Sequence, residues 1–207
     1  MEMSKPRILV LASGSRDGGG SGLQEMVEYS RTNPPVLDAD IVGVISNHAQ
    51  GGISKKARAL GITFCHWPGP YTAEWYRSVV SEFDAHYVMC SGWLKKVMGL
   101  DPSRTINIHP GPLPFTEGLY GHHVHEAMMA AYHRGEMKQS AVTMHFITED
   151  YDRGPIFFRQ PIFIRPDDTP ETLARRVNEV ERAVQSFMLN QVVHGRIALE
   201  QGRVIYR

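Results

Sequence analysis

The stretch that decides the fold lies in the middle of the chain and reads Thr105-Ile106-Asn107-Ile108-His109-Pro110-Gly111-Pro112-Leu113-Pro114. Asn107 and His109 alternate with two isoleucines, which is the period of a strand whose faces differ. The prolines that follow cannot continue a central strand, so the chain must leave the sheet after His109. Because open α/β sheets bind ligands at the carboxyl ends of their strands, we expect Asn107 and His109 to point into such a crevice. An amide donor beside an imidazole suits an oxygen that gains negative charge.

Short apolar runs alternate with helical patterns along the first half of the chain. Strands are expected at 7–13, 40–46, 62–65 and 86–90, with helices beginning near Leu23, Ser54 and Thr72. This alternation predicts an α/β fold with a Rossmann-like, doubly wound, mostly parallel sheet.

The second half of the chain predicts an antiparallel C-terminal extension. Residues 141–147 and 156–164 are typical of adjoining strands, and 195–206 of a terminal hairpin around Gln201-Gly202. The last long helix begins at Thr169-Pro170-Glu171, which combines a capping side chain, a proline at the first position and an early carboxylate.

Composition indicates a globular chain without a charged partner. The chain has 207 residues and 42% apolar content, which fits one domain. Lys plus Arg equal Asp plus Glu at 22 each, so no net field favours nucleic acid or an anionic membrane. Residues 1–6 lack the apolar core of a signal peptide, so we expect a cytoplasmic protein. We also expect either a monomer or a homodimer.

A glycine-rich loop follows the first predicted strand and leads into a helix. Gly14 to Gly22 would leave backbone N–H groups at the helix start free to hold an anion. The loop matches neither common phosphate-binding signature, and a flexible crossover loop is the other interpretation.

Two further regions have open interpretations. Trp93, Leu94 and Val97 would either line a flat apolar slot or pack under the sheet. Glu181 stands at the edge of an apolar helix stripe, where it either meets a cation or amine or reaches to water.

A histidine-rich segment raises the question of a metal, and its histidines are His122, His123, His125 and His133. Their spacing does not supply a third ligand and does not reproduce a metalloprotease motif, so we expect no metal. The favoured roles are contacts with an anion or a substrate near the crevice, or a polar helix start.

The chain resembles the folate-dependent formyltransferases over nearly its whole length. The most specific part is Asn107-Ile108-His109-Pro110 with a downstream Asp152-Arg153-Gly154-Pro155, and it implies Asn107, His109 and Asp152 as catalytic residues. Gly20, Ser21 and Gly22 resemble the phosphate loop of the family. Glu181 matches a helix glutamate that lies near the substrate's glycinamide portion, and His122 would border the same substrate.

The resemblance implies transfer of a formyl group from 10-formyltetrahydrofolate, a co-substrate, to the amine of glycinamide ribonucleotide in purine biosynthesis. Asn107 would donate to the oxyanion, a protonated or polarised His109 would stabilise it, and Asp152 would orient His109 and favour its charged form. The folate-binding residues it implies are Trp93, Leu94, Lys95, Val97, Thr148, Glu149, Asp150 and Tyr151. We therefore expect a formyltransferase fold over 1–207, with a phosphate-binding half at about 1–100 and a catalytic and folate-binding half at about 101–207.

Departures from the family pattern cluster on the acceptor side. Residues 15–19 are an insertion, Gly22 stands where the family commonly has Asn, and 71–76 lacks the arginine that the family often uses for phosphate. The segment 118–140 is longer than usual. Alternatives are therefore a formyltransferase for another amine, such as an amino sugar nucleotide, a formyltetrahydrofolate hydrolase, or a binding module without turnover.

Overall fold

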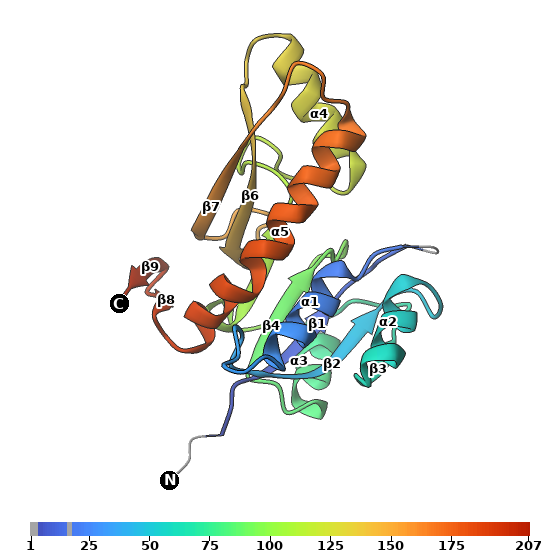
Figure 1. Ribbon diagram of the computed structural model, residues 1–207. Coiled ribbons are helices and arrows are strands. Elements are labelled where there is room, and N and C mark those ends of the chain that lie inside the picture. Colours follow the sequence, from blue (N-terminus) through green and yellow to red (C-terminus); the bar gives the residue numbers. More distant parts are fainter. Residues whose placement is uncertain (1–3, 16–17) are drawn as a thin grey trace.

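The structure is a computed structural model that describes residues 4–15 and 18–207. Two sequence-based expectations therefore lie partly outside the described residues. They are the insertion at 15–19 and the interpretation of residues 1–6. Within the described residues one seven-stranded sheet has the order β3-β2-β1-β4-β5-β6-β7 (Figure 1). Its strands are β1 (Arg7–Leu11), β2 (Asp40–Ser46), β3 (Phe64–His66), β4 (Tyr87–Ser91), β5 (Thr105–His109), β6 (Gln139–Phe146) and β7 (Ile156–Phe163).

The strands β1 to β5 pair in parallel, and β6 and β7 extend the sheet in antiparallel fashion. This arrangement confirms the predicted α/β sheet. The expected bounds differ by a few residues; for example, the strand expected at 62–65 is β3, which begins at Phe64.

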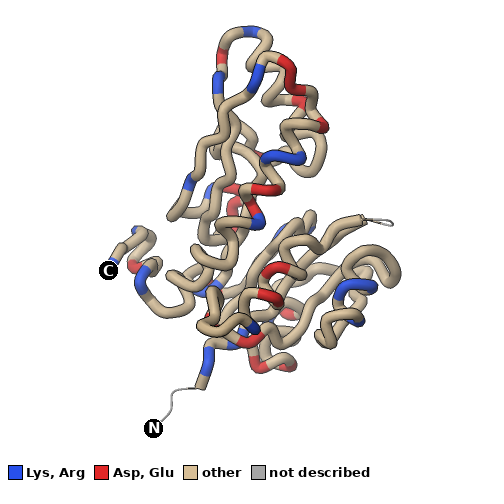
Figure 2. Tube along the Cα trace, in the orientation of Figure 1, with Lys and Arg blue, Asp and Glu red and all other residues tan. Residues whose placement is uncertain are grey.

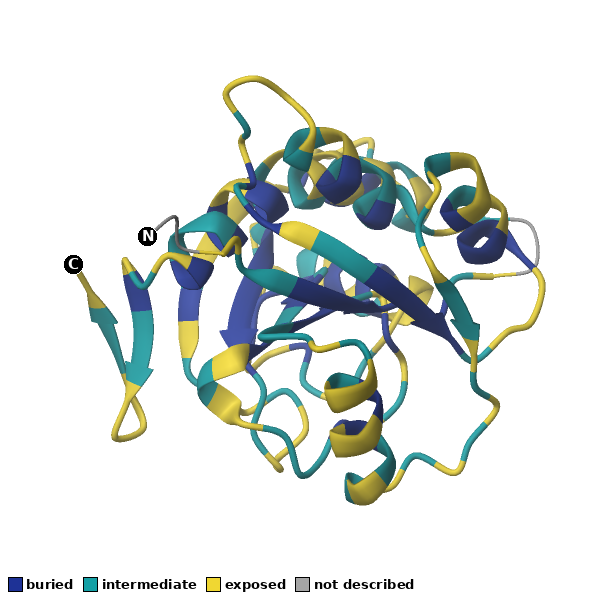
Figure 3. Cartoon of the chain, turned by 90° about the horizontal axis from the view of Figure 1, so that it is seen from below, coloured by how far each residue is buried: buried dark blue, intermediate teal, exposed yellow. Residues whose placement is uncertain are grey.

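Helices cover both faces of the sheet, as a doubly wound fold requires. They are α1 (Ser21–Ser30), α2 (Gly52–Leu60), α3 (Ala73–Glu82), α4 (His122–His133) and α5 (Pro170–Val193), with a short 3-10 helix at Pro102–Arg104. Successive side chains of β1 point to opposite faces. Ile8 and Val10 pack with α1, α2, α4 and α5, whereas Leu9 and Leu11 pack with α3. Figure 3 shows the buried strands between these layers.

The order of the strands reverses beside β1, which lies between β2 and β4. Loops that leave neighbouring strands in opposite directions open a crevice at this point. Ser13, just after β1, holds the loop after β4 because its N–H donates to the carbonyl oxygen of Gly92 at 3.0 Å and its hydroxyl accepts from Leu94 N–H at 3.1 Å. The prolines after β5 leave the sheet at the same edge.

The long helix α5 joins the two halves of the chain. Thr169 caps it by accepting a hydrogen bond from Thr172 N–H at 3.3 Å, and Pro170 occupies its first turn, as predicted. The helix packs on α1 and α4 (Figure 1). Because strands from both halves share one sheet, the division near residue 100 stays a prediction.

The chain ends in a separate two-stranded sheet of β8 (Ile197–Glu200) and β9 (Arg203–Tyr206). Gln201 and Gly202 have φ angles of 48° and 75°, the left-handed values of a tight hairpin turn. The predicted hairpin is confirmed.

Two further features are the distribution of charged residues and the apolar character of the helices. Figure 2 shows basic and acidic residues interspersed along the chain, in line with the equal totals of 22. Among the described helices, none combines the length and apolar character that a membrane crossing needs.

The loop between β6 and β7 is held tightly at its end. Phe146 N–H donates to the carbonyl oxygen of Pro155 at 3.0 Å. Gly154 is buried so closely that a Cβ atom there would overlap the carbonyl oxygen of Phe146. Asp152, two residues earlier, has a φ angle of 56°. A close backbone contact therefore sets the position of the Asp152 carboxylate.

Replacing Gly154 by alanine should destabilise the protein, because the new methyl group can fit only if the backbone moves. We expect Gly154→Ala to lower the free energy of unfolding by about 2 kcal/mol or more, measured by urea denaturation. Gly135→Ala is the matched control: a Cβ there meets open space, so its left-handed φ of 76° costs only about 1 kcal/mol. Equal losses in the two variants would contradict the proposed contact.

Candidate active site

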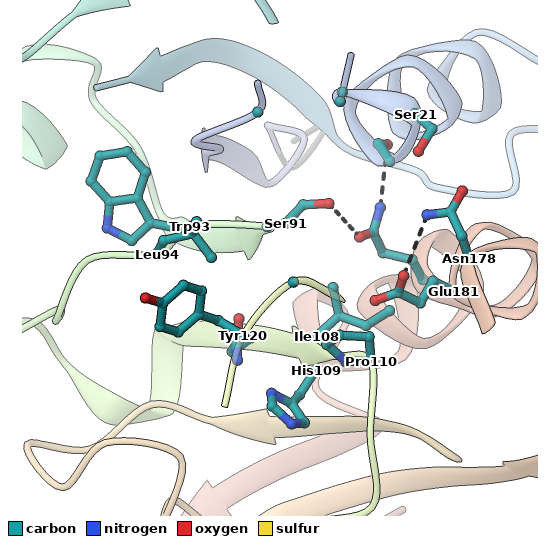
Figure 4. A pocket seen from close by; sticks show the side chains of 18 of the residues that line it. Ser21, Ser91, Trp93, Leu94, Ile108, His109, Pro110, Tyr120, Asn178 and Glu181 are labelled. Carbon is teal, nitrogen blue, oxygen red and sulfur yellow. Dashed lines mark hydrogen bonds between the residues drawn. The ribbon is translucent and has the colours of Figure 1, made fainter. Parts of the chain in front are cut away.

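A cavity of about 280 Å³ opens at the carboxyl ends of β1, β4 and β5 (Figure 4). Its walls come from the glycine-rich loop, from Ser91 to Leu94, from Asn107 to Pro110, from Leu119 to Gly121, from Tyr151 and Asp152, and from one face of α5. Trp93 and Leu94 lie toward one end of the pocket in Figure 4, and Asn178 and Glu181 toward the other. The crevice predicted from the prolines after β5 is present.

Asn107 is oriented by a histidine on the neighbouring strand. The antiparallel pairing places Asn107 opposite His145, with 3.0 Å between Asn107 Nδ2 and His145 Nε2. The other ring nitrogen, Nδ1, lies 3.1 Å from the carbonyl oxygen of Phe146, which can only accept. Nδ1 therefore carries the hydrogen and Nε2 accepts from Asn107. The second hydrogen of the Asn107 amide nitrogen remains available for a ligand.

Burial controls the charge of both histidines at this site. Burial, reinforced for His109 by His145 and His125, lowers the pKa of His109 to about 4, and burial alone lowers the pKa of His145 to about 4. His109 is 4% exposed. Both rings are therefore neutral in the free protein at neutral pH.

Asp152 lies between these rings without touching either. Its carboxylate oxygens lie 3.9 Å from His109 Nδ1 and 3.8 Å from His145 Nε2. Burial raises the pKa of Asp152 to about 6, against a hydrogen bond from Gly118 N–H at 3.2 Å. The expectation that Asp152 favours the charged form of His109 stays a prediction, because burial sets the pKa of His109 in the free protein and Asp152 lies beyond hydrogen-bond distance of its ring.

The glycine-rich loop forms one end of the pocket, as expected from the sequence. Gly20, Ser21 and Gly22 line the pocket at the start of α1. Gly20 has a φ angle of 77°, and no side chain caps the helix. The first N–H groups of α1 are therefore available to an anion.

A buried glutamine explains why glycine stands at position 22. Gln185 Nε2 donates to the carbonyl oxygen of Gly22 at 3.2 Å, and Ser91 Oγ donates to Gln185 Oε1 at 2.8 Å (Figure 4). A Cβ atom on Gly22 would overlap Ser91 Oγ. Glycine at position 22, where the family commonly has asparagine, therefore leaves room for the hydrogen bonds that link Gln185 to Gly22 and to Ser91.

The wall contributed by α5 holds residues that the sequence reasoning missed. Asn178, Arg182 and Gln185 line the pocket together with Glu181, at helical spacings of three and four residues that place them on one face. Burial raises the pKa of Glu181 to about 7, although Asn178 donates to it at 3.4 Å. The same helical spacing was the signal that would have found them.

Most of the expected folate-binding residues gather on one side of the site. Trp93 and Leu94 line the main pocket, and a second pocket that shares Asn107, Trp93, Tyr151 and Asp152 is also lined by Lys95, Val97, Thr148 and Asp150. Glu149 borders a shallower hollow next to Val97 and Thr148.

His122 does not reach this pocket. Its Nε2 lies 3.3 Å from a carboxylate oxygen of Glu171 and 3.7 Å from one of Glu126, so it links the starts of α4 and α5 on the surface. Across residues 4–15 and 18–207 there is no group of three or more His, Cys, Asp or Glu side chains placed to hold a metal.

Replacing Asp152 by asparagine should stabilise the fold at alkaline pH. Because the pKa of Asp152 is raised to about 6, the folded carboxyl binds its proton more tightly than the unfolded one. Its stabilising contribution is therefore complete below about pH 4 and is lost as the pH rises through about 6. We expect Asp152→Asn to raise the free energy of unfolding by about 2 kcal/mol at pH 8 and by little at pH 4, measured by urea denaturation.

The exposed neighbour Asp150 supplies the control, and Asp150→Asn should change the free energy of unfolding little. If Asp152→Asn changes the free energy of unfolding by the same amount at pH 4 and pH 8, the pKa of Asp152 is not raised in the folded protein.

Comparisons with known proteins identify the family to which the chain belongs. The sequence model of the formyl transferase family matches residues 6–189 of this chain. The chain is 29% identical over 194 residues to the chloroplastic phosphoribosylglycinamide formyltransferase of Arabidopsis thaliana, and the match covers 87% of this chain and 64% of that protein. It is 25% identical to phosphoribosylglycinamide formyltransferase of Escherichia coli, with 94% of this chain and 90% of that protein covered.

A solved structure gives the same result. Glycinamide ribonucleotide transformylase 1 from Symbiobacterium toebii superposes with a TM-score of 0.83 at 28% identity, covering 98% of this chain and 95% of the other. Because the family match spans most of the described chain, the chain belongs to the formyl transferase family.

Proposed function

We propose that this chain transfers the formyl group of 10-formyltetrahydrofolate to the amine of glycinamide ribonucleotide, a step of de novo purine biosynthesis. The observation that carries the proposal is the meeting of Asn107, His109 and Asp152 between the uncapped start of α1 and a second pocket that holds most of the implied folate-binding residues. The names of the Arabidopsis thaliana and Escherichia coli relatives support the same acceptor.

In the proposed reaction the amine nitrogen attacks the formyl carbon and an oxyanion forms. The free hydrogen of Asn107 Nδ2 donates to that oxygen. His109, neutral before reaction, takes the proton that the amine loses, and the resulting imidazolium stabilises the oxyanion. The proton then passes to the folate nitrogen as the carbon–nitrogen bond breaks. Asp152 would hold a water that takes part in this transfer, since it lies 3.9 Å from His109.

The two ends of the pocket suit the two substrates. The phosphate of the nucleotide would bind the N–H groups at Gly20, Ser21 and Gly22, and its glycinamide portion would lie near Glu181. The folate would lie against Trp93 and Val97, with the loop from Thr148 to Tyr151 over it, an arrangement that the second pocket favours. No residue in this scheme needs a metal.

The setting of the enzyme follows from the same proposal. We expect two small-molecule substrates, no nucleic-acid partner, a cytoplasmic location and a monomer or homodimer. These properties rest on the proposed activity and on the balanced charge of the chain.

The first experiment follows the absorbance of a 10-formyl folate analogue with and without glycinamide ribonucleotide. We expect turnover that requires the nucleotide, and Asn107→Ala should lower kcat by about 100-fold or more because one oxyanion donor is lost. The KM for the folate should change little.

The other outcomes of this assay identify the alternatives. Turnover without any amine would indicate a hydrolase. Folate binding with no turnover would contradict this acceptor and favour another amine. A loss of folate affinity in Asn107→Ala that matches its loss of rate would contradict the assigned role of Asn107.

Arg182 offers a second test, aimed at the acceptor. Of the described residues that line the main pocket, it is the only one with a permanent positive charge. We expect Arg182→Gln to raise the KM for glycinamide ribonucleotide by about tenfold, since a charge-assisted contact with phosphate is lost. The KM for a glycinamide riboside that lacks the phosphate should not change.

Arg175→Gln is the matched control, because Arg175 is an exposed arginine of α5 outside the pocket. If Arg182→Gln affects both acceptors alike, or neither, Arg182 is not a phosphate ligand.

A further inference from the structure

The closest partner of His109 is a threonine from the loop that follows the prolines. His109 Nε2 lies 2.9 Å from the hydroxyl oxygen of Thr116, which is fully buried. Gly111 leaves the space for this contact, because a Cβ atom there would overlap Thr116 Oγ1 and lie 2.8 Å from a methyl group of Val124. The loop is therefore shaped around a single side-chain hydroxyl.

The hydroxyl has a second neighbour that fixes the direction of its hydrogen. Thr116 Oγ1 donates to the carbonyl oxygen of Pro112 at 3.3 Å, and a carbonyl oxygen can only accept. A hydroxyl has one hydrogen, so when Thr116 donates it to Pro112 the hydroxyl accepts from His109, and His109 Nε2 then carries a hydrogen.

The opposite tautomer leaves one hydrogen without a partner. With the hydrogen on Nδ1, the carboxylate oxygen Asp152 Oδ2 lies 3.9 Å away, which is too far for a hydrogen bond. The other titratable groups near the ring, His145 from β6 and His125 from α4, both disfavour its charged form. The arrangement that satisfies the buried polar groups therefore has a hydrogen on Nε2 and a lone pair on Nδ1.

We propose that Thr116 is a positioning residue that holds His109 in the Nε2–H tautomer, so that the Nδ1 lone pair faces the reacting groups. Nδ1 is then the atom that takes the amine proton in the proposed transfer. After protonation the Nε2–H remains bound to Thr116, so the cation keeps its buried partner. The chemical step of this inference rests on the proposed function, but the tautomer does not.

The test is ¹⁵N NMR of histidine-labelled protein at pH 7 without substrate, with the His109 signals assigned by their absence in His109→Gln. Native protein and Thr116→Ser should show the Nε2–H pattern. Thr116→Val keeps the shape of the side chain but not its acceptor, so the Nε2–H form should lose its dominance.

Kinetics supply the second readout. Thr116→Val should lower kcat by about tenfold or more while the KM for the folate stays within about threefold, and Thr116→Ser should restore most of the rate. Thr105→Val is the matched control: Thr105 is a buried threonine at the other end of β5, and its hydroxyl donates to Asp101 O at 2.8 Å. It should leave the His109 signals unchanged.

An Nδ1–H pattern in the native protein would overturn the inference. An unchanged pattern in folded Thr116→Val would do the same. If the NMR result is as expected but glycinamide ribonucleotide is not formylated, the proposed function fails and the role of Thr116 as a positioning residue stands.

Discussion

The antiparallel pairing of β5 with β6 is the constraint on which the site depends. If β6 ran parallel to β5, both strands would end at the edge of the sheet where the pocket lies. Only the last residue of β6 would then reach the site. Here Asn107 faces His145 across the ladder, and the chain leaves β6 close enough to return Asp152 to His109. The register of this one strand pair therefore places His145 where it orients the Asn107 amide. It also brings the Asp152 carboxylate beside the His109 ring.

Loss of hydration then determines which of these groups are charged. Two neutral histidines and an acid with a pKa of about 6 lie around a space where the proposed reaction creates charge. A neutral His109 has a lone pair for the amine proton, which a protonated histidine would lack. Desolvation in the free protein is thus compatible with a histidine that acquires its charge during the reaction, when an oxyanion is there to stabilise it.

The sequence predicted those parts of the site that depend on local periodicity. The alternation around Asn107 and His109 predicted the strand, and the prolines predicted its end, because neither depends on the rest of the chain. The sequence left open whether His109 is charged, because its burial arises from packing among α4, β6 and the proline loop. Gln185 lies 163 residues from Gly22, to which it donates, so no local pattern connects the two.

The end of the pocket proposed to bind the acceptor and the proposed transfer centre are built from different side-chain contacts. Gly22, Ser91 and Gln185 form a bridge between α1, β4 and α5, whereas His109 and Thr116 belong to β5 and its following loop. The side-chain hydrogen bonds of the two groups involve different residues, and the groups meet through the β4–β5 ladder, where Ser91 pairs with Ile108. A change in the glycine-rich loop can therefore reshape that end of the pocket while the side-chain contacts of Asn107 and His109 stay the same. This separation accounts for a chain in which the residues of the proposed transfer match the family pattern while the residues at the acceptor end depart from it.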